Sequence, residues 1–401
     1  RLTTLVTAGT NGKGSTTRIL ARLLQAAGLR VATYTSPHLL RVHERLLIDD
    51  RPIDAVAFAG QVDAMRESVE RHEASWFETL TAVSVQLAAD AGVDVLCAET
   101  GLGGRLDATN ALPAAATLLT TVDLDHQHIL GETREQILDE KLGLLEAGTP
   151  FFSAIQPELN AQAFRAAIEA GSPAYFLDEI TRTEEASDHW RLVLRERVID
   201  GLPLLGSATM RRNAALALLC LDTLAQAGRL PLPDDPAAAL AELFLPGRLQ
   251  TVFTRPDVVV DTGHNAQALL GTLSWFLERP VRGRRIVIFG GMHDKAVPRE
   301  LGPLLDRCDA VTFAPISLPR SRDRENLRKL WADLELPDPA GHSIVDSVAA
   351  ALAYWGPRLR PDDAVLVTGS GFLVAETLHR LGVRDLEETR RPRPATDVLP
   401  G

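Results

Sequence analysis

The sequence predicts an α/β protein of two domains, in which mostly parallel sheets carry helices on both faces. A chain of 401 residues is longer than one compact core usually holds. Short apolar segments with the character of buried strands alternate with amphipathic helical segments over the first 120 residues. The same alternation returns after residue 245, which indicates a second and smaller α/β domain.

The first domain is expected to span residues 1–245. Its helix at 15–27 is predicted by apolar residues that share one helical face, with Gly28 as the stop. A second helix is expected at 77–92, and strands at 2–8, 30–35, 93–98 and 118–122. Residues 160–240 are predicted to be mostly helical, with a polar strand-like segment at 189–199.

The second domain is expected to span residues 246–401. Four apolar strands are predicted at 257–260, 286–289, 310–313 and 364–367, separated by helical patterns. Residues 390–401 are rich in proline and arginine, so they are expected to form a loose tail.

Composition disfavours several classes of protein. The net charge is −11, from 42 basic and 53 acidic residues, which argues against a nucleic-acid binder. The longest apolar run, 214–221, is too short to cross a bilayer, so no membrane association is expected. Cys97, Cys220 and Cys308 are widely separated and fit a reducing cytosol, and we expect a cytoplasmic monomer. The sequence opens on Arg1, which leaves a preceding targeting segment open.

A glycine-rich loop between the first strand and the first helix has the placement of a phosphate-binding loop. It reads GTNGKGST from Gly9, although Thr7 stands where the strict motif begins with glycine, and Gly14 follows the lysine. Backbone N–H groups, the helix N-terminus and Lys13 are suited to bind phosphates, and a plain glycine-rich turn is the alternative. We therefore expect ATP to contact Thr10, Asn11, Gly12, Lys13, Gly14 and Ser15.

Two other strands end in polar residues at the same predicted sheet edge. Glu99 ends a buried strand, and Ser36 and His38 follow another. A carboxylate there is well placed to bind a nucleotide's metal ion, and helix or turn capping is the alternative for Glu99 and Ser36.

Eight segments, in order, resemble the folylpolyglutamate and dihydrofolate synthase branch of the Mur ligase superfamily. They follow the loop GTNGKGS, which shares the resemblance, and are YTSPHL, FETLT, ETGLGGRLDATN, TVDLDHQHILG, TREQILDEKLG, NAALAL, PGR and DTGHN. The resemblance implies a P-loop-containing, Mur-ligase-like domain followed by a Rossmann-like one. It also implies an ATP-dependent ligase that joins L-glutamate to dihydropteroate or folate through an acyl phosphate.

The resemblance assigns roles to individual residues. Ser36 and Glu99 hold one Mg²⁺, to which phosphate-loop logic adds Ser15, and His126 holds a second Mg²⁺. Lys141 matches a carbamylated lysine, which would make Lys13, His126 and Lys141 the catalytic set. The implied ATP contacts outside the loop are Asn213, Arg248 and Asp261. The implied substrate contacts are Ser75, Leu106, Asp107 and Ala108 for the pteroate, and His264 for glutamate.

Some positions depart from the family pattern. DTGHNA stands where the family has DGAHNP, and the helical segment that contacts dihydropteroate before the phosphate loop is not part of this sequence. Two rival functions stay open at this point. One is a Mur-type ligase for another carboxylate, and the other is a non-catalytic ATP-binding module, which the presence of Lys13, Glu99 and His126 disfavours.

Overall fold

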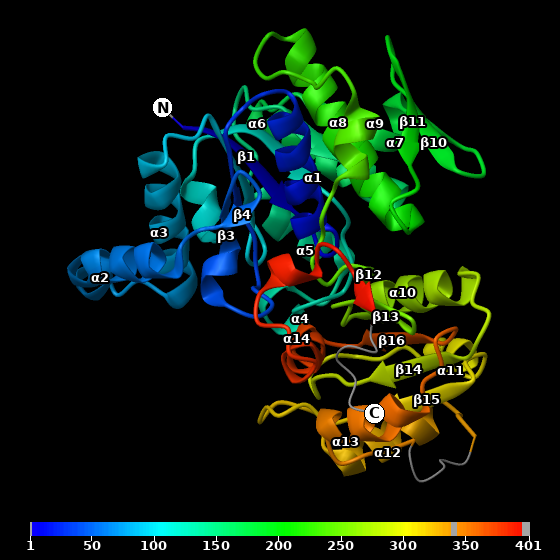
Figure 1. Cartoon of the computed structure of the whole chain (residues 1–401). Helices are drawn as coiled ribbons and strands as arrows, with labels where there is room; N and C mark the ends of the chain where they lie inside the picture. The colour runs from blue at the N-terminus through cyan, green and yellow to red at the C-terminus, as the bar shows by residue number, and fades with distance from the viewer. Residues whose placement is uncertain (1, 338–342, 395–401) are drawn as a thin grey trace. The chain divides into compact units, whose positions relative to one another are not determined.

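A computed structural model describes residues 2–337 and 343–394. The chain divides into two compact units, unit 1 (Arg1–Leu243) and unit 2 (Phe244–Gly401), close to the boundary predicted at 245/246. Figure 1 shows the course of the chain through both units. The predicted α/β fold class is confirmed in each of them.

The centre of unit 1 is a sheet of eight strands within the described residues. Its order is β4 (Arg51–Pro52), β3 (Leu46–Ile48), β2 (Val31–Tyr34), β5 (Val95–Glu99), β1 (Thr3–Ala8), β6 (Ala114–Leu119), β7 (Phe151–Ser153) and β8 (Ala174–Phe176). Strands β2, β5, β1, β6, β7 and β8 run parallel. At one edge, β3 pairs antiparallel with β2, and β4 pairs antiparallel with β3. The central strands β2 and β5 are buried on both faces, which explains why their sequences, VATY and VLCAE, show no alternation of apolar and exposed polar residues.

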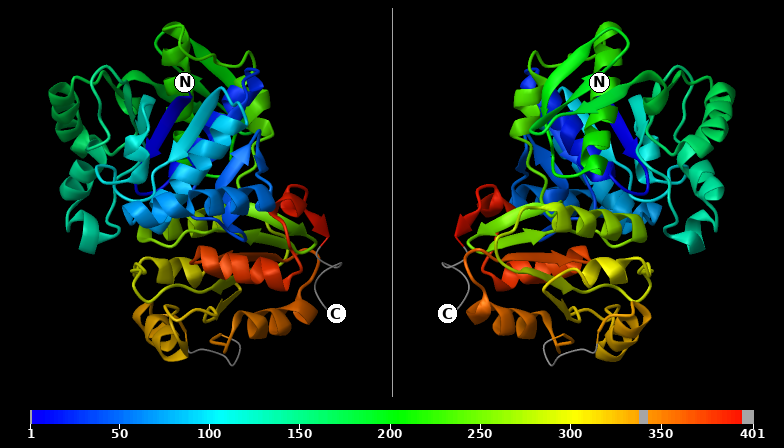
Figure 2. Two further views of the ribbon diagram at one scale, coloured as in Figure 1. Left: turned by 90° about the vertical axis from the view of Figure 1, so that its left-hand side faces the viewer. Right: turned by 90° about the vertical axis from the view of Figure 1, so that its right-hand side faces the viewer.

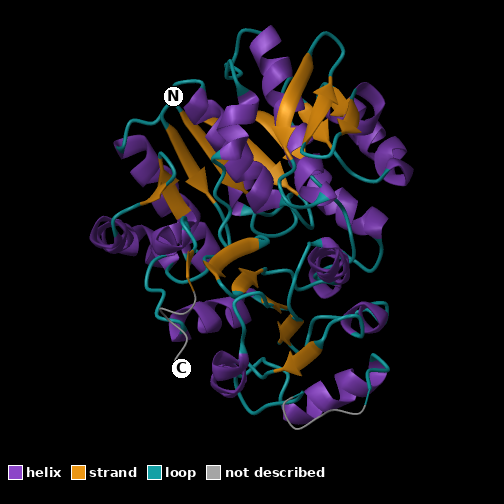
Figure 3. Cartoon of the chain, turned by 45° about the vertical axis from the view of Figure 1, so that its right-hand side comes forward, coloured by secondary structure: helices purple, strands orange, loops and turns teal. Residues whose placement is uncertain are grey.

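Helices lie on both sides of this sheet (Figure 3). Val6 and Ala98 are register partners, and on their face of the sheet the side chains pack against α3, α5 and α6. Helix α1 packs against α8 and the central strands. The helices of unit 1 are α1 (Lys13–Ala26), α2 (Ala55–His72), α3 (Trp76–Asp90), α4 (Gln127–Leu130), α5 (Arg134–Leu142), α6 (Asn160–Ala170), α7 (Leu177–Ile180), α8 (Ala208–Gln226) and α9 (Pro236–Ala241), with 3₁₀ turns η1 (Val42–Arg45), η2 (Ala108–Ala111) and η3 (Pro157–Leu159).

One segment of unit 1 corrects the sequence prediction. Residues 160–240 were expected to be mostly helical with a strand-like segment at 189–199, and that segment is found in β10 (His189–Val193) and the start of β11 (Val198–Pro203). These two strands and the unpredicted β9 (Arg182–Glu185) form a three-stranded antiparallel sheet. This sheet is separate from the large one (Figure 2). The residues of β9 are all exposed and polar, so they lack the apolar pattern that predicts a strand.

Unit 2 contains a six-stranded sheet within its described residues. Its order is β15 (Ala310–Phe313), β14 (Arg285–Phe289), β16 (Ala364–Thr368), β13 (Asp257–Val260), β12 (Gln250–Thr254) and β17 (Arg393–Pro394). The four predicted strands are confirmed and run parallel. The helices are α10 (Ala266–Glu278), α11 (Leu301–Leu305), α12 (Arg324–Asp333), α13 (Val348–Trp355) and α14 (Gly371–Arg380), with η4 (Gly356–Arg358) and η5 (Leu386–Thr389).

The edge of this sheet also corrects the prediction. Strand β12 was not predicted, and it pairs antiparallel with β13. Residues 390–394 were expected to be loose, yet Arg393 and Pro394 pair with β12, and the Arg390 guanidinium lies over the Phe244 ring. The rest of the predicted tail lies outside the described residues.

The three cysteines are free thiols. Cys97 on β5 and Cys220 on α8 are completely buried in unit 1, and burial raises the pKa of both thiols. Cys308 of unit 2 is partly exposed, and burial raises its pKa to about 12. In the described part of the chain, no helix has the length and apolar character needed to span a bilayer.

Candidate active site

The phosphate loop, residues 9–12, connects the end of β1 to the start of α1. Gly12 precedes the helix with φ 89°, a left-handed conformation that side-chain-bearing residues rarely adopt. Having no side chain, Gly12 cannot cap the first N–H groups of α1, and such a helix start suits a phosphate. A Cβ on Gly12 would lie 2.6 Å from Asn213 Oδ1, so the predicted adenine-side residue Asn213 sits directly against this loop.

A clamp of residues that the sequence did not single out holds the loop in place. The Thr120 hydroxyl donates to the Asn11 carbonyl at 2.6 Å, and the Thr121 hydroxyl approaches the same oxygen at 3.2 Å. The Thr121 hydroxyl also accepts a hydrogen bond from the Asn11 N–H at 3.3 Å. The Thr121 carbonyl accepts one from the Thr10 N–H at 2.7 Å. The Asp123 N–H donates to the Thr10 hydroxyl at 3.0 Å. The loop is therefore fixed to the segment that follows β6.

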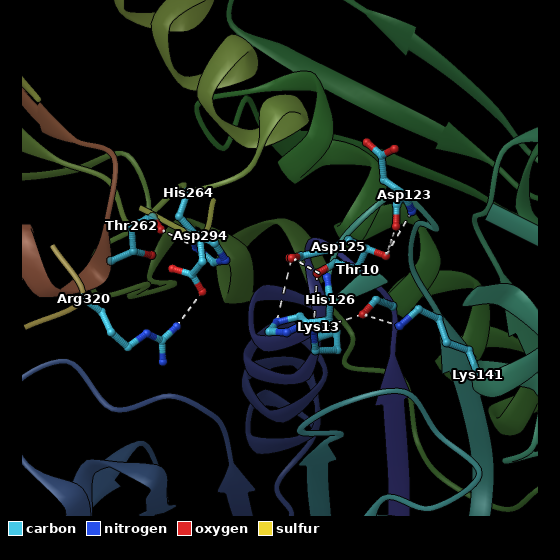
Figure 4. Close-up of polar contacts among 11 residues, drawn as sticks. Thr10, Lys13, Asp123, Asp125, His126, Lys141, Thr262, His264, Asp294 and Arg320 are labelled. Atoms are coloured by element: carbon cyan, nitrogen blue, oxygen red, sulfur yellow. Dashed lines mark hydrogen bonds and ion pairs between the residues drawn. The ribbon is translucent and has the colours of Figure 1, made fainter. Parts of the chain in front are cut away.

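Two lysines converge on one backbone oxygen of the loop (Figure 4). Lys13 Nζ donates to the Gly9 carbonyl at 3.0 Å and to the Thr10 carbonyl at 3.3 Å. Lys141 Nζ, from α5, donates to the same Gly9 carbonyl at 3.2 Å. The structure thus brings together two residues that are 128 positions apart and were both predicted to be catalytic.

Lys141 is an unusual lysine because its side chain is 4% exposed. Burial and the nearby charge of Lys13 lower its pKa to about 7, against the opposing influence of Asp125 and Asp107. A Cβ on Gly104 would lie 2.8 Å from the Lys141 carbonyl oxygen, so the glycine-rich segment packs tightly against the end of α5. At neutral pH, a large fraction of this amine is uncharged and nucleophilic.

An oxygen-rich group gathers at the adjacent strand ends. Glu99 ends β5 with 4% exposure, and its Oε2 accepts the Ser36 N–H at 2.8 Å. A Cβ on Gly14 would lie 2.9 Å from the same Oε2, so the carboxylate reaches the first turn of α1, where Ser15 is buried. Carboxylate and hydroxyl oxygens fit the preference of Mg²⁺, so these residues suit the predicted metal.

His126 lies just after the clamp and caps α4 with φ 50°. Its backbone N–H donates to Asp125 Oδ1 at 2.9 Å, and its ring Nε2 lies 3.9 Å from that oxygen. Asp125 was not predicted, although it stands in the quoted TVDLDHQHILG segment. In the described ranges, no group of three or more His, Cys, Asp and Glu side chains is arranged to hold a metal ion. Both metal positions therefore stay predictions.

The residue predicted to contact pteroate on α3 has a structural partner. The Ser75 hydroxyl accepts the Glu78 N–H at 3.3 Å, and the Glu78 carboxylate accepts the Ser75 N–H at 2.7 Å. This reciprocal capping box starts α3. Ser75 therefore has a folding role whether or not it contacts a substrate.

The other predicted pteroate contacts lie in one short segment with contrasting exposure. Leu106 is 91% exposed, and Ala108 begins η2. Asp107 is buried and accepts the Leu102 N–H at 2.8 Å and the Thr109 hydroxyl at 2.6 Å. Asp107 therefore organises the segment, and Leu106 offers an apolar surface to a ligand.

In unit 2, Asp261 organises the segment that carries Arg248. Its carboxylate accepts the Leu249 N–H at 3.0 Å, the Gly263 N–H at 2.8 Å and the Thr272 hydroxyl at 2.8 Å. The group is 5% exposed, and both oxygens are engaged. Asp261 thereby fixes the backbone immediately after Arg248.

His264 follows in the same loop. Its Nδ1 lies 3.1 Å from the Thr262 carbonyl oxygen, which requires the hydrogen on Nδ1 (Figure 4). Nearby in the sequence, Asn265 caps α10 by accepting the Ala268 N–H at 3.1 Å. This arrangement fixes the orientation of the imidazole that was predicted to lie near glutamate.

Comparison with known proteins gives consistent results over nearly the whole chain. The family described as Mur ligase, glutamate ligase domain matches residues 247–371. The dihydrofolate synthase/folylpolyglutamate synthase of Escherichia coli is 32% identical and covers 94% of this chain and 86% of its own. The folylpolyglutamate synthase of Lacticaseibacillus casei is 30% identical and covers 92% and 87%.

Solved structures agree. Escherichia coli FolC in complex with DHPP and ADP superimposes with a TM-score of 0.83 at 30% identity, covering 95% of this chain and 89% of its own. A bifunctional folylpolyglutamate synthase/dihydrofolate synthase with Mn, AMPPNP and L-glutamate bound has a TM-score of 0.81 at 29% identity, with coverage of 95% and 89%.

Proposed function

This chain belongs to the dihydrofolate synthase/folylpolyglutamate synthase family of Mur ligases, and from that membership we propose that it joins L-glutamate to dihydropteroate or a folate with ATP. The observation that carries the proposal is the clamped phosphate loop, on which Lys13 and Lys141 converge. The relatives' names favour the folate acids over another carboxylate acceptor.

The chemistry requires two transfers. A carboxylate oxygen of the acid attacks the γ-phosphorus of ATP, and ADP leaves, which gives an acyl phosphate. The amine of glutamate then attacks the acyl carbon, loses a proton and expels inorganic phosphate, which leaves an amide. Lys13 and the N-terminus of α1 are suited to balance the charge on the phosphates during the first transfer.

The proposed reaction uses divalent metal ions, because the oxygen ligands at the sheet edge suit Mg²⁺. Glu99, Ser36 and Ser15 would hold one Mg²⁺, and His126 would contribute to a second. When bound, the metal ions would neutralise charge on the ATP phosphates. A structural relative bound to Mn and AMPPNP supports a nucleotide-associated divalent metal.

We include carbamylation of Lys141 in the proposal. Carbamylation requires an uncharged amine that attacks carbon dioxide, and burial next to Lys13 supplies one near neutral pH. The product is an anion close to the phosphate loop, where it would offset the charge of Lys13. It would thereby replace the repulsion between two amines by an attraction.

The remaining assignments concern ligand contacts. Asn213 against the loop is suited to the nucleotide, and Arg248, in the segment fixed by Asp261, is suited to its phosphates. His264 is suited to the incoming glutamate. Ser75, Leu106, Asp107 and Ala108 form the proposed acid-binding set, in which Leu106 supplies an exposed apolar side chain.

A coupled assay of ADP release tests the function. Release should require an acid together with glutamate, with dihydropteroate and tetrahydrofolate active and a muramyl nucleotide inactive. Lys13→Ala should abolish release, whereas Lys329→Ala, which removes an exposed lysine of α12, should not. Glu99→Gln should sharply raise the Mg²⁺ concentration required. ADP release that ignores the acid would rule out the ligase.

A further inference from the structure

The loop after β2 carries an imidazole, His38, that the proposed reaction does not yet use. This loop is fixed where it leaves the strand. The Thr35 N–H donates to the Arg45 carbonyl at 2.8 Å, and the Ser36 N–H donates to Glu99 at 2.8 Å. His38 therefore stands two residues beyond the backbone contact to the proposed metal-binding carboxylate.

A buried glutamate holds the other end of the loop. Glu44 is 6% exposed, and its carboxylate accepts three successive backbone N–H groups. The distances are 3.1 Å from Leu39, 3.0 Å from Leu40 and 3.0 Å from Arg41. With both ends anchored, the backbone at His38 has little freedom to rearrange when a ligand binds.

Arg45 determines which nitrogen of His38 carries the hydrogen. The Arg45 side chain is buried, and its Nε–H donates to His38 Nδ1 at 3.0 Å. A guanidinium is only a donor, so Nδ1 must present its lone pair and the hydrogen must be on Nε2. This is the tautomer that leaves a donor at the far end of the ring.

The outer nitrogen of His38 is available to a ligand. The ring is half-buried, and in the described ranges Arg45 is its hydrogen-bond partner. His43 in the same region is arranged in the opposite way. Its Nδ1 lies 2.7 Å from the Ile53 carbonyl, and its Nε2 is buried with no hydrogen-bond partner among the described residues. His43 is therefore part of the packing, whereas His38 presents a fixed donor.

We propose that His38 is a ligand-binding residue of the ligase site, whose Nε2–H donates to an anionic oxygen of the acid or of the ATP phosphates. The proposal rests on the ligase function proposed above. It follows from the anchored loop, the tautomer fixed by Arg45 and the contact of the loop with Glu99, whose carboxylate reaches the first turn of α1. An anionic partner is favoured because Arg45 places a positive charge behind the ring.

Three substitutions separate the donor from the shape of the ring. Glutamine places its amide N–H₂ close to the position of Nε2, so His38→Gln keeps a donor, and His38→Leu removes it. Arg45→Met keeps a long side chain but removes the donor to Nδ1, so either nitrogen of His38 can carry the hydrogen. His72→Leu, at an exposed histidine of α2, is the matched control. Melting temperatures establish that each variant is folded.

Binding is measured separately for ADP and for dihydropteroate, by titration calorimetry in the presence of Mg²⁺. His38→Leu should weaken one of the two ligands about tenfold, as expected for a lost hydrogen bond to a charged group. His38→Gln should stay within about threefold of wild type, and His72→Leu should match wild type. Weaker ADP binding identifies the phosphates as the partner, and weaker acid binding identifies the carboxylate.

The ¹⁵N chemical shifts of His38 test the tautomer directly. Wild type should show the hydrogen on Nε2, and Arg45→Met should show a mixture. The proposal is overturned if His38→Leu binds both ligands like wild type, if His38→Gln is as defective as His38→Leu, or if wild type carries the hydrogen on Nδ1. A wild-type protein without ligase activity would refute the proposed function instead, and the ADP titration would still test His38.

Discussion

The amines of Lys13 and Lys141 both donate to the Gly9 carbonyl, and their closeness affects the charge of Lys141. Lys13 is at the start of α1 beside the phosphate loop, and Lys141 is buried behind it. Two ammonium groups so placed repel each other, and the buried one is the less solvated. Burial and the charge of Lys13 therefore lower the pKa of Lys141 to about 7.

This leads to a pH prediction for Lys141. The uncharged amine becomes dominant as pH rises through about 7, so carbamate should form more readily at pH 8 than at pH 6. Added bicarbonate should therefore raise ligase activity more at pH 8 than at pH 6. Lys141→Ala should be inactive and partly restored by a short carboxylic acid. Ligase assays in buffer depleted of carbon dioxide, with and without added bicarbonate, measure this. A fully active Lys141→Ala would contradict it.

The same pKa predicts how stability depends on pH before carbamylation. The folded pKa is lowered from 10.5 to about 7, so between these values the unfolded chain binds a proton that the folded chain does not. Stability should therefore rise with pH across this window in wild type. Lys141→Met should remove that rise, as measured by urea unfolding at pH 7 and pH 9 without carbon dioxide. Parallel slopes for the two proteins would argue against the lowered pKa.

The contacts of Thr120 and Thr121 with the phosphate loop can be tested with a control on β6, the strand that precedes them. Thr120→Val and Thr121→Val should raise the KM for ATP about tenfold, because each removes a hydroxyl that positions Asn11. The serine variants should retain most of the affinity. Thr117→Val on β6 should leave KM unchanged, because that buried hydroxyl has no partner among the described residues. Steady-state kinetics decides the matter, and valine variants with a wild-type KM would show that the clamp is dispensable.

At the scale of elements, helix α1 is bounded by two glycines that play different roles. Gly12 begins it with φ 89°, and Gly28 follows it with φ 87°. A Cβ on Gly12 would meet the Asn213 side chain at 2.6 Å, whereas a Cβ on Gly28 would meet nothing within 4 Å. Both positions carry the cost of a left-handed backbone, and Gly12 alone adds a steric conflict at the proposed ATP site.

The paired alanine variants separate these effects. Gly28→Ala should cost about 1 kcal/mol of stability and leave ADP affinity unchanged. Gly12→Ala should cost at least as much stability and also weaken ADP binding by tenfold or more. Thermal unfolding and calorimetric titration provide the two measurements. Equal ADP affinity in the two variants would mean that the loop tolerates displacement of Asn213.

The elements also show what a sequence can and cannot predict. Strands such as β5 and β14 are continuous apolar runs, and their prediction needs no partner. Strand β9 is polar and exposed, so its pairing with β10 leaves no apolar signature. Lys13 was recognisable from its loop, whereas the contact of Thr120 with Asn11 spans 109 positions. It arises only because β1 and β6 are neighbours in the sheet.

At the scale of the whole molecule, each unit has its own core and its own buried polar supports. In unit 2, the Asp363 side chain is completely buried and accepts the Arg284 guanidinium at 2.6 Å, the Arg284 N–H at 2.8 Å and the Arg360 N–H at 2.8 Å. Burial alone raises the pKa of this carboxyl, but the hydrogen bonds outweigh it and the pKa is lowered. Its stabilising contribution is therefore present at neutral pH and lost as pH falls below the ordinary carboxyl range.

Asp363→Asn should therefore weaken unit 2 selectively. The expected loss is about 2 kcal/mol at pH 7, shrinking as the pH approaches 3. Calorimetry should resolve two unfolding transitions. ADP should raise the transition temperature of unit 1, and Asp363→Asn should lower the transition temperature of unit 2. Asp362→Asn, at an exposed neighbour, is the control. A single transition that responds to both changes would show that the units unfold together.

The cysteines described above differ in burial, so thiol labelling can report the opening of unit 1. A thiol-specific alkylating reagent can reach Cys97 and Cys220 only when the core of unit 1 opens, whereas the partly exposed Cys308 can react while unit 2 is folded. Mass spectrometry of timed labelling would then record the opening rate of unit 1, with Cys308 in the same sample as the reference for reagent reactivity.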